Sequence, residues 1–331
     1  MNPTPDDIIE FIYNNKTAIS ELGSDLGVKK LDKGYLINII APICHFFSIK
    51  RKPDKPIIVS FTGGQGSGKT TMAKYATFFL KKFFHLRTIS FSLDDIYLSK
   101  NKREKLAKDI HPLCKTRGVP GTHDVKLGID TILSLVNAND NTKTDIPSFS
   151  KLNDDVLPRS AWERYNGKPD IILFDGWCSG LRPIEAKEWM HPINSLERKF
   201  DQKGIWSEWS YKELSGKYQD LFGMFDYLIF IALDNMKTVF ESRWLQEKSL
   251  LIKKDEMHQS SKPMTKDQVY EFVMHFERIS MHVFEELPKY SDFVLKREKD
   301  FYYKIVEAPN EFDYNYAVSY THLTLPTTPY V

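Results

Sequence analysis

Short apolar runs alternate along the chain with stretches in which apolar residues recur every three to four positions. The runs are typical of buried strands, and the spaced stretches are typical of amphipathic helices. We expect strands at residues 57–61, 88–93, 170–177, 225–233 and 292–296, with a short extended segment at 146–151. We expect helices at residues 6–22, 33–48, 72–80, 100–109, 125–136 and 265–286, and another after residue 233. Strands that alternate with helices predict an α/β fold with a parallel sheet flanked by helices.

The first predicted strand runs through a glycine-rich turn into a helix. The turn fits the P-loop pattern G-x-x-x-x-G-K-T, whose backbone N–H groups surround nucleotide phosphates. Lys69 is expected to reach the β- and γ-phosphates, and the Thr70 hydroxyl to ligate Mg²⁺. A glycine-rich hairpin or linker is the alternative, and the strand–turn–helix context favours the nucleotide site. The predicted nucleotide-binding residues here are Gly63, Gly64, Gln65, Gly66, Ser67, Gly68, Lys69, Thr70 and Thr71.

Acidic residues stand at the ends of two predicted strands. Asp94 and Asp95 follow the strand at 88–93, and Asp175 lies near the end of the strand at 170–177. Ligands of open α/β sheets bind at the carboxyl ends of the strands. Asp94 is therefore the favoured catalytic base, and Asp175 is predicted to hold Mg²⁺ directly or through water. The alternatives are a helix cap or turn for one residue of the Asp94–Asp95 pair, and a strand-ending turn at Asp175.

The glycine- and proline-rich residues 116–124 predict a shaped loop before the next helix. Arg117 and His123 in this loop are candidates for contact with an anion, whereas Asp124 is as well suited to cap the helix. Further along the chain, Lys151 and Arg159 lie in segments expected to face the γ-phosphate. Because guanidinium groups hold carboxylates through paired hydrogen bonds, this set favours a carboxylate-bearing substrate.

Composition narrows the class of protein. The 331 residues carry a net charge of +2, which indicates neither nucleic-acid binding nor an acidic tail, and no apolar run approaches the ~20 residues of a membrane span. The start of the chain lacks the pattern of a signal peptide. The three cysteines, Cys44, Cys114 and Cys178, lack metal-site spacing and are predicted to be reduced thiols of a cytoplasmic protein. We expect a monomer or weak homo-oligomer; a small hydroxy acid as its substrate is what the resemblance described next implies.

Several segments, taken together, resemble the plant-type D-glycerate 3-kinase family. This family is a branch of the P-loop kinases that includes uridine kinase, phosphoribulokinase and type I pantothenate kinase. The matching segments are residues 63–71, 92–98, 117–124, 174–177, 218–222, 243–247 and 286–288. The resemblance implies that Asp94 is the base and Asp175 lies near Mg²⁺. It also implies that Arg243 belongs to a lid over the phosphates. The residues that it places beside the acceptor are Arg117, His123, Asp124 and Lys151.

One segment departs from the family pattern. The family's loop after the extended segment is rich in glycine and arginine, whereas residues 152–159 here read L-N-D-D-V-L-P-R. Arg159 supplies the only matching charge.

The resemblance also predicts the organisation of the chain. We expect a P-loop NTPase-type parallel sheet flanked by helices, with N-terminal helices and a helical lid or insert. Residues 1–52 would form the N-terminal extension, 53–307 the kinase domain with a helical elaboration at about 183–222, and 308–331 a tail. From about residue 318 the tail resembles a translated sequencing adapter, so it is predicted to be an artefact; a genuine disordered tail is the alternative.

The leading hypothesis is an enzyme that uses ATP and Mg²⁺ to phosphorylate D-glycerate to 3-phosphoglycerate. A kinase of another small alcohol, such as a nucleoside or a pantothenate-like compound, is the second hypothesis. The third is a regulatory protein that binds a nucleotide without turnover. A GTPase switch is not favoured, because the chain has no guanine-specifying N-K-x-D motif.

Overall fold

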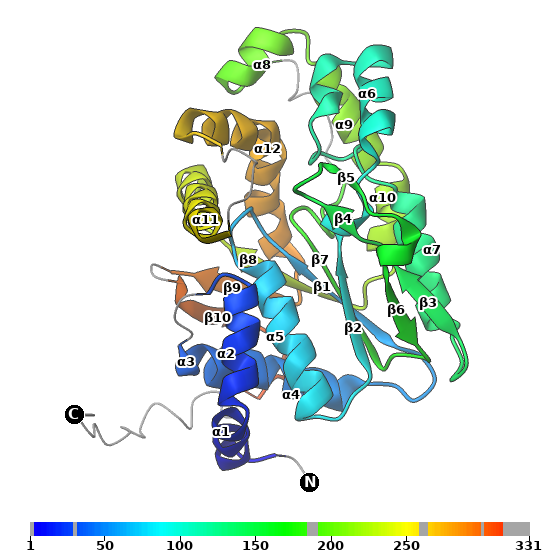
Figure 1. The fold of residues 1–331 in the computed structure, drawn as a ribbon, viewed down its shortest axis with the longest axis vertical. Helices are drawn as coiled ribbons and strands as arrows, with labels where there is room; N and C mark the ends of the chain where they lie inside the picture. Colours follow the sequence, from blue (N-terminus) through cyan, green and yellow to red (C-terminus); the bar gives the residue numbers. More distant parts are fainter. Residues whose placement is uncertain (1–2, 29–31, 184–190, 258–263, 299–300, 314–331) are drawn as a thin grey trace, which may run out of the picture.

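The computed structural model describes residues 3–28, 32–183, 191–257, 264–298 and 301–313, without the side chains of 249–257. A six-stranded sheet with the order β10-β9-β8-β1-β7-β2 forms its centre (Figure 1). The predicted strands are all present, and the five are parallel to one another. β10 was not predicted and pairs antiparallel with β9 at the edge. The strands are β1 (Ile57–Thr62), β2 (Thr88–Ser92), β7 (Ile171–Gly176), β8 (Tyr227–Ala232), β9 (Phe293–Arg297) and β10 (Tyr303–Glu307).

Helices cover both faces of the sheet, which confirms the predicted α/β class. Alternate residues of a strand point to opposite faces. Accordingly, Ile57, Val59 and Phe61 of β1 enter one core, and Ile58 enters the other. The first core includes helices α1 (Pro5–Asn14), α2 (Lys16–Asp25), α4 (Ala41–Lys50) and α5 (Lys69–Lys82). The second includes α7 (Val125–Val136), α9 (Ile205–Leu214), α10 (Lys217–Phe222) and α12 (Lys266–Glu286).

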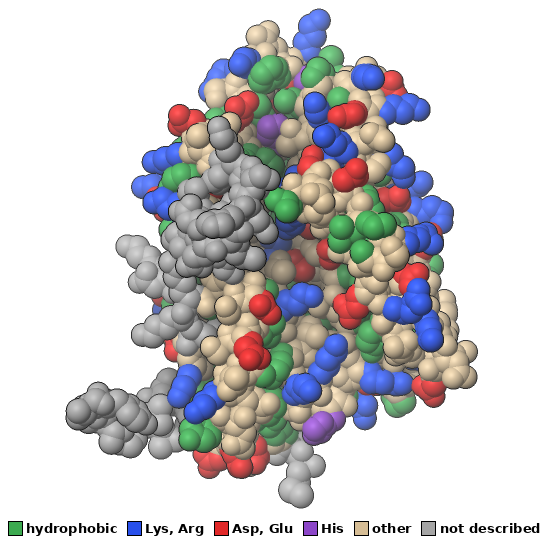
Figure 2. Space-filling model, viewed as in Figure 1, with side chains coloured by type: hydrophobic (Ala, Val, Ile, Leu, Met, Phe, Trp, Pro, Cys, Tyr) green, Lys and Arg blue, Asp and Glu red, His purple; other side chains and the backbone are tan. Residues whose placement is uncertain are grey.

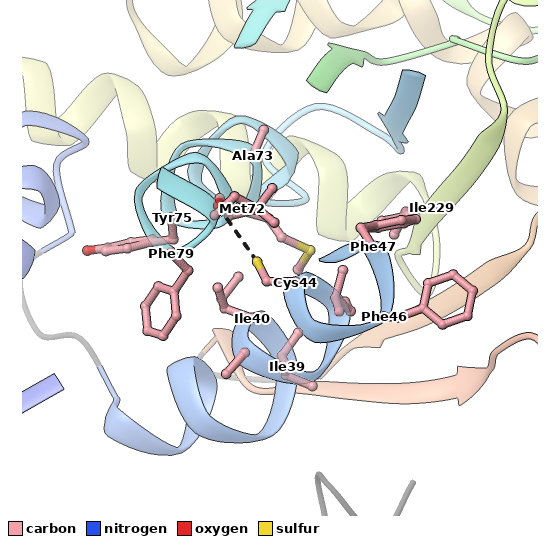
Figure 3. Close-up of a cluster of buried hydrophobic side chains, with 14 of the residues drawn as sticks. Ile39, Ile40, Cys44, Phe46, Phe47, Met72, Ala73, Tyr75, Phe79 and Ile229 are labelled. Atoms are coloured by element: carbon pink, nitrogen blue, oxygen red, sulfur yellow. Dashed lines mark hydrogen bonds between the residues drawn. The ribbon is translucent and has the colours of Figure 1, made fainter. Parts of the chain in front are cut away.

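The N-terminal helices pack against the helix that follows the P-loop. α3 (Lys33–Tyr35), a π-helical turn (Leu36–Ile40) and α4 run on from one another. Figure 3 shows Ile39, Ile40 and Phe47 beside Met72 and Phe79 of α5. The extension therefore shares a core with the sheet and supports the back of α5.

The predicted helix at 6–22 is wrong in one respect, because it is two helices that meet at Asn15. The Asn15 side-chain amide donates a hydrogen bond of 2.9 Å to the carbonyl of Phe11, and this bond satisfies the end of α1. Asparagine competes in this way with the helical hydrogen bonds of the backbone.

Smaller elements lie in the connections between the strands of the sheet. The short helices η2 (Leu93–Ile96), η3 (Pro112–Lys115) and η4 (Arg159–Ala161) lie in connecting segments, and α6 (Lys100–Asp109), α8 (Ser195–Phe200) and α11 (Met236–Met257) are longer. Two hairpins pair β3 (Lys143–Ile146) with β6 (Glu163–Asn166), and β4 (Phe149–Ser150) with β5 (Asp155–Val156). The helical elaboration predicted at 183–222 consists of α8 to α10, but residues 184–190 lie outside the described residues, as does the suspect tail from 318.

The three cysteines and the apolarity of the helices can be examined in the described residues. Cys44, Cys114 and Cys178 are free thiols with buried side chains. Cys44 packs between α4 and α5, 3.7 Å from the carbonyl of Ala76 (Figure 3). Within the part of the chain that the structure describes, none of the helices combines the length and apolarity needed to cross a bilayer.

Candidate active site

The P-loop joins β1 to the N-terminus of α5, where Figure 2 shows a hollow lined by acidic and basic side chains. Gly63 has a φ of 148°, and a Cβ there would lie 2.5 Å from the carbonyl oxygen of Ile231. Gly68 has a φ of 95°, and a Cβ would lie 2.1 Å from the Tyr303 hydroxyl. Only glycine fits these two positions. The loop can therefore aim its N–H groups and the start of α5 at an anion.

The two predicted Mg²⁺ ligands lie side by side. β7 is the neighbour of β1, so Asp175 ends its strand next to the P-loop. The Thr70 hydroxyl donates a hydrogen bond of 2.8 Å to Oδ2 of Asp175, and the Ser92 hydroxyl donates one of 3.0 Å to its carbonyl oxygen. Burial raises the pKa of Asp175, and the charge of Lys69 partly offsets this rise. A hydroxyl and a carboxylate are oxygen ligands of the kind that Mg²⁺ prefers.

Asp94 is held as a carboxylate between two donors. Nζ of Lys151 lies 2.6 Å from Oδ2 of Asp94, and the Tyr97 hydroxyl donates a hydrogen bond of 2.9 Å to Oδ1. Burial alone would raise the pKa of Asp94, but Lys151, Lys69 and the Tyr97 hydroxyl outweigh it and hold that pKa well below the usual range. Asp94 is therefore ionised and able to accept a proton.

Asp95 has a structural role instead. Its carboxylate accepts a hydrogen bond of 2.8 Å from the backbone N–H of Ser92 and forms a capping box with that residue at the start of η2. Burial raises the pKa of Asp95 to about 7, and the charges of Asp175 and Asp94 add to the effect. The cap foreseen for one of the two aspartates thus applies to Asp95, and Asp94 faces Lys151.

His123 lies beside this base as a neutral ring. It stacks on Tyr97 with a centroid distance of 4.5 Å, and its Nδ1 is 2.6 Å from the Tyr218 hydroxyl. Burial lowers the pKa of His123 to about 3, so at neutral pH it offers a hydrogen bond and no charge. Its Nε2 is buried and has no hydrogen-bond partner among the described residues. Contact with the acceptor remains a prediction for this residue.

Arg117 is engaged by an acidic residue of the protein itself. Its guanidinium group forms an ion pair with the carboxylate of Asp154 and lies 5.7 Å from the centre of the Phe149 ring. Arg103 of α6 contacts the same carboxylate at 3.0 Å, and its side chain is 1% exposed. Arg103 is therefore buried, although the helix that carries it is strongly charged. Phe149 is buried beneath this loop.

Two predicted acceptor residues have other contacts. Asp124 accepts a hydrogen bond of 3.2 Å from the backbone of Leu127 and caps α7, and it pairs with Lys102 at 3.3 Å. This is the capping alternative that the sequence left open. Arg159 is exposed in η4, with its guanidinium group 5.5 Å from the Trp162 ring centre. A role in acceptor binding remains a prediction for both residues.

Sequence reasoning missed the residues that brace the P-loop from outside. Arg297 of β9 donates hydrogen bonds to the carbonyl oxygen of Gly66 and, at 2.8 Å, to the hydroxyl of Ser242 on α11. The Tyr303 hydroxyl of β10 donates a hydrogen bond of 2.9 Å to the carbonyl of Ser67. No local motif marks these contacts, because the two that reach the P-loop join residues more than 230 positions apart and the one to Ser242 joins residues 55 positions apart.

Arg243 stands on α11 next to Ser242, which Arg297 contacts. Its guanidinium group pairs with Glu247 at 3.0 Å and lies 5.6 Å from the Phe272 ring centre. Ser242 also lies against the P-loop, since a Cβ at Gly66 would approach the Ser242 Cβ to 2.4 Å. α11 is thus packed against the phosphate loop, and a role of Arg243 over the phosphates remains a prediction.

We expect Arg297→Met to weaken ATP binding by about tenfold, since charge-assisted hydrogen bonds that fix the loop would be lost. The measurement is the Kd for ATP from calorimetry. Lys296→Met is the matched control, because the neighbouring Lys296 points to the other face and pairs with Asp234 at 3.4 Å. Equal Kd values for ATP in the two variants would contradict the bracing role.

Comparisons with known proteins bear on the fold and on the class of enzyme. No family model matches the chain. The uncharacterized kinase mug58 of Schizosaccharomyces pombe is 29% identical over 246 residues, which are 72% of this chain and 85% of that protein. The chloroplastic D-glycerate 3-kinase of Arabidopsis thaliana is 31% identical over 138 residues, which are 40% of this chain and 30% of that enzyme. The cytoplasmic location remains a prediction, since this relative is chloroplastic.

A solved structure supports the architecture. The D-glycerate 3-kinase of Cryptococcus neoformans var. grubii superposes with a TM-score of 0.65 at 20% identity, over 82% of this chain and 99% of that one. This likeness confirms the P-loop kinase fold. The named relatives bear out the predicted phosphotransferase with an alcohol acceptor. The chain is thus similar in sequence to proteins named as kinases, one of which is a D-glycerate 3-kinase.

Proposed function

We propose that this protein transfers the γ-phosphoryl group of ATP to the 3-hydroxyl of D-glycerate. The observation that carries the proposal is the position of Asp94. The charge of Lys69 lowers the pKa of this ionised carboxylate and also that of Asp175. Asp175 accepts a hydrogen bond from Thr70 of the P-loop. A base for an alcohol and a cradle for phosphates are therefore close together. Two of the similar proteins are named D-glycerate 3-kinase, which supports this acceptor.

Thr70 and Asp175 would hold Mg²⁺, which when bound neutralises charge on the phosphate oxygens. Lys69 would bind the β- and γ-phosphates. Burial lowers the pKa of Lys69, but the charges of Asp175 and Asp94 oppose this and favour its cationic form. Backbone N–H groups at the start of α5 would orient the phosphate chain.

Asp94 would accept the proton of the acceptor hydroxyl. Tyr97 holds one oxygen of its carboxylate, and the other is bonded to Lys151. An acceptor hydroxyl at Asp94 would therefore have to share or replace the contact with Lys151. Lys151 is 63% exposed along its side chain, so its ammonium group can move aside into solvent.

Arg117 is the residue best suited to bind the glycerate carboxylate. It lies on the ring of Phe149, which also packs against Tyr97, the hydroxyl partner of Asp94. A guanidinium group binds a carboxylate through two parallel hydrogen bonds, which fixes the orientation of the acid. The hydroxyl of the same small molecule could then approach Asp94.

We expect Arg117→Ala to raise KM for D-glycerate by about one to two orders of magnitude, given ~1.5–3 kcal/mol for a charge-assisted hydrogen bond. KM for ATP should change little. Arg117→Lys keeps the charge and loses the planar fork, so a substantial defect is expected in that variant too. A normal KM for glycerate in Arg117→Ala would remove Arg117 from the acceptor site.

An acceptor comparison tests the assignment. Purified protein with ATP and Mg²⁺ is offered D-glycerate, uridine or pantothenate, and ADP release is measured. We expect the highest kcat/KM with D-glycerate. Efficient turnover of uridine or pantothenate instead would leave the phosphotransferase and remove the glycerate proposal. A protein that binds ATP and turns over none of the three would fit a regulatory role.

A further inference from the structure

The tip of the β4–β5 hairpin carries acidic residues where the family resemblance leads us to expect glycine and arginine. Residues 151–154 form the turn, and Asp154 has a φ of 53°, in the left-handed region. Leu152 is 62% exposed, so this turn is not fixed by burial of its apolar side chain. Charged contacts hold it in place instead.

Two ion pairs join the tip to the candidate acceptor site. Lys151 at one end contacts Asp94, the candidate base, at 2.6 Å. Asp154 at the other end contacts Arg117, the candidate carboxylate-binding residue. The candidate base and the candidate carboxylate-binding residue are thus both paired with an opposite charge from the same four-residue turn.

Arg103 does not need the Asp154 carboxylate to satisfy its hydrogen bonds. Its Nε donates a hydrogen bond of 3.1 Å to the carbonyl oxygen of Leu98, and its Nη1 donates one of 2.8 Å to the carbonyl oxygen of Lys115. Its Nη2 donates a hydrogen bond of 2.6 Å to the carbonyl oxygen of Asp154. This buried arginine therefore fixes the backbone of the turn. It shares the Asp154 carboxylate with Arg117, since its Nη2 lies 3.0 Å from Oδ2 whereas Arg117 pairs with Oδ1.

We propose that the Asp154 carboxylate is an internal stand-in for the carboxylate of the acceptor. In this arrangement Asp154 occupies the Arg117 guanidinium group until a small carboxylic acid replaces it. Asp154 is then a specificity-determining residue. A neutral alcohol gains nothing at Arg117 and has no means of displacing Asp154, whereas an acid exchanges one carboxylate for another. The inference rests on the proposed function, since it assigns the substrate carboxylate to Arg117.

The same exchange bears on the base. Lys151 and Asp154 belong to one turn, so a turn that releases Arg117 loses one of its contacts. Arg103 still holds the backbone at Asp154, but the exposed side chain of Lys151 can leave Asp94. Binding of the acid at Arg117 would in this way favour access of its hydroxyl to Asp94. A ligand shifts such an equilibrium only through its different affinity for the two states.

Asp154→Asn tests the inference. Asparagine has nearly the same shape, tolerates a positive φ, and removes the charge. We expect KM for D-glycerate to fall by about three- to tenfold, because an internal competitor for Arg117 is weakened. Calorimetric Kd values for D-glycerate should fall in the same proportion, which gives a readout independent of turnover. Thermal melting checks that the variant is folded.

Asp155→Asn is the matched control. Asp155 is the next acid along the hairpin, and its carboxylate accepts a hydrogen bond of 3.0 Å from the backbone N–H of Lys100 instead of contacting Arg117. Its replacement by asparagine changes the net charge of the protein by the same amount as Asp154→Asn. KM for D-glycerate should stay unchanged in this control. In an Arg117→Ala background, Asp154→Asn should no longer lower KM for D-glycerate, because the effect of Asp154 depends on its ion pair with Arg117.

The outcomes separate the two claims. A KM for D-glycerate that is unchanged or raised in Asp154→Asn would overturn the inference, and a raised value would show that Asp154 orients Arg117 for its substrate. The proposed function would survive either result. If the unmodified protein neither binds nor phosphorylates D-glycerate, the proposed function and the inference both fall.

Discussion

Lys69→Ala is expected to reduce phosphoryl transfer by about 10³-fold or more, the range seen when a cationic group that stabilises transferred phosphate is lost. Lys69 is the first residue of α5 and follows Gly68, whose left-handed backbone turns the chain into the helix. The fold should persist, because the N-terminus of α5 carries other donors and burial disfavours the charge of Lys69. Steady-state turnover and the thermal melting temperature are the two measurements.

Lys82→Ala provides the control for this variant. Lys82 lies in the last turn of the same helix and is exposed. Lys82→Ala therefore changes the net charge and the composition of the helix by the same amount as Lys69→Ala. Turnover and melting temperature should match the unmodified protein. Wild-type turnover in Lys69→Ala would show that the glycine-rich turn does not act as a P-loop.

Asp94→Asn is expected to lower kcat by about 10²–10⁴-fold, the usual contribution of a positioned general base. Asparagine can still accept the hydrogen bond from Tyr97 but cannot accept a proton from the substrate. ATP binding should be nearly unchanged, since the P-loop is intact. Lys151 loses its partner in this variant, but it is exposed enough to be solvated. Rapid-quench measurement of kcat and calorimetric Kd for ATP separate the two effects.

Asp95→Asn is the informative comparison. The pKa of Asp95 is raised to about 7, so at neutral pH a large share of its carboxyl is already uncharged, as an amide would be. An asparagine oxygen can also accept the hydrogen bond from the backbone of Ser92. We therefore expect a small effect on kcat. A severe loss in Asp95→Asn together with normal activity in Asp94→Asn would reverse the assignment of base and cap.

The parts of the site that could be predicted are those carried by local patterns at the ends of buried strands. The P-loop and Asp175 follow largely apolar runs, and Asp94 follows a run in which apolar residues alternate with serine. Parallel strands bring their carboxyl ends to one edge of the sheet. The sequence could therefore predict that the P-loop and Asp175 lie together, as the hydrogen bond from Thr70 to Asp175 shows.

The contacts that could not be predicted are long-range and depend on side-chain direction. Arg103 lies in a strongly charged helix, yet its guanidinium group turns inward to bind three carbonyl oxygens. Arg297 and Tyr303 reach the P-loop from the far end of the chain. β10 was missed because an exposed edge strand has too few buried positions to give an apolar run. The break at Asn15 depends on a side-chain hydrogen bond that periodicity does not register.

The acceptor was the least accessible feature, because residues 152–159 depart from the family pattern. In the structure the Asp154 carboxylate forms an ion pair with Arg117, so the acidic residue that departs from the family pattern has a defined partner. Arg159, the one residue that matched the family's charge, is instead exposed beside Trp162. Charge composition alone could not distinguish the two arginines, since the difference between them lies in which one contacts the hairpin.

Direct identification of the product tests the central claim, which is transfer of a phosphoryl group to the 3-hydroxyl of D-glycerate. Purified protein, ATP, Mg²⁺ and D-glycerate are followed by ³¹P nuclear magnetic resonance. The account predicts that the γ-phosphate signal of ATP disappears as the signals of ADP and 3-phosphoglycerate rise in equal amounts, and that Asp94→Asn slows this conversion. Phosphorylation at the 2-hydroxyl, or release of inorganic phosphate without a phosphorylated acid, would contradict it.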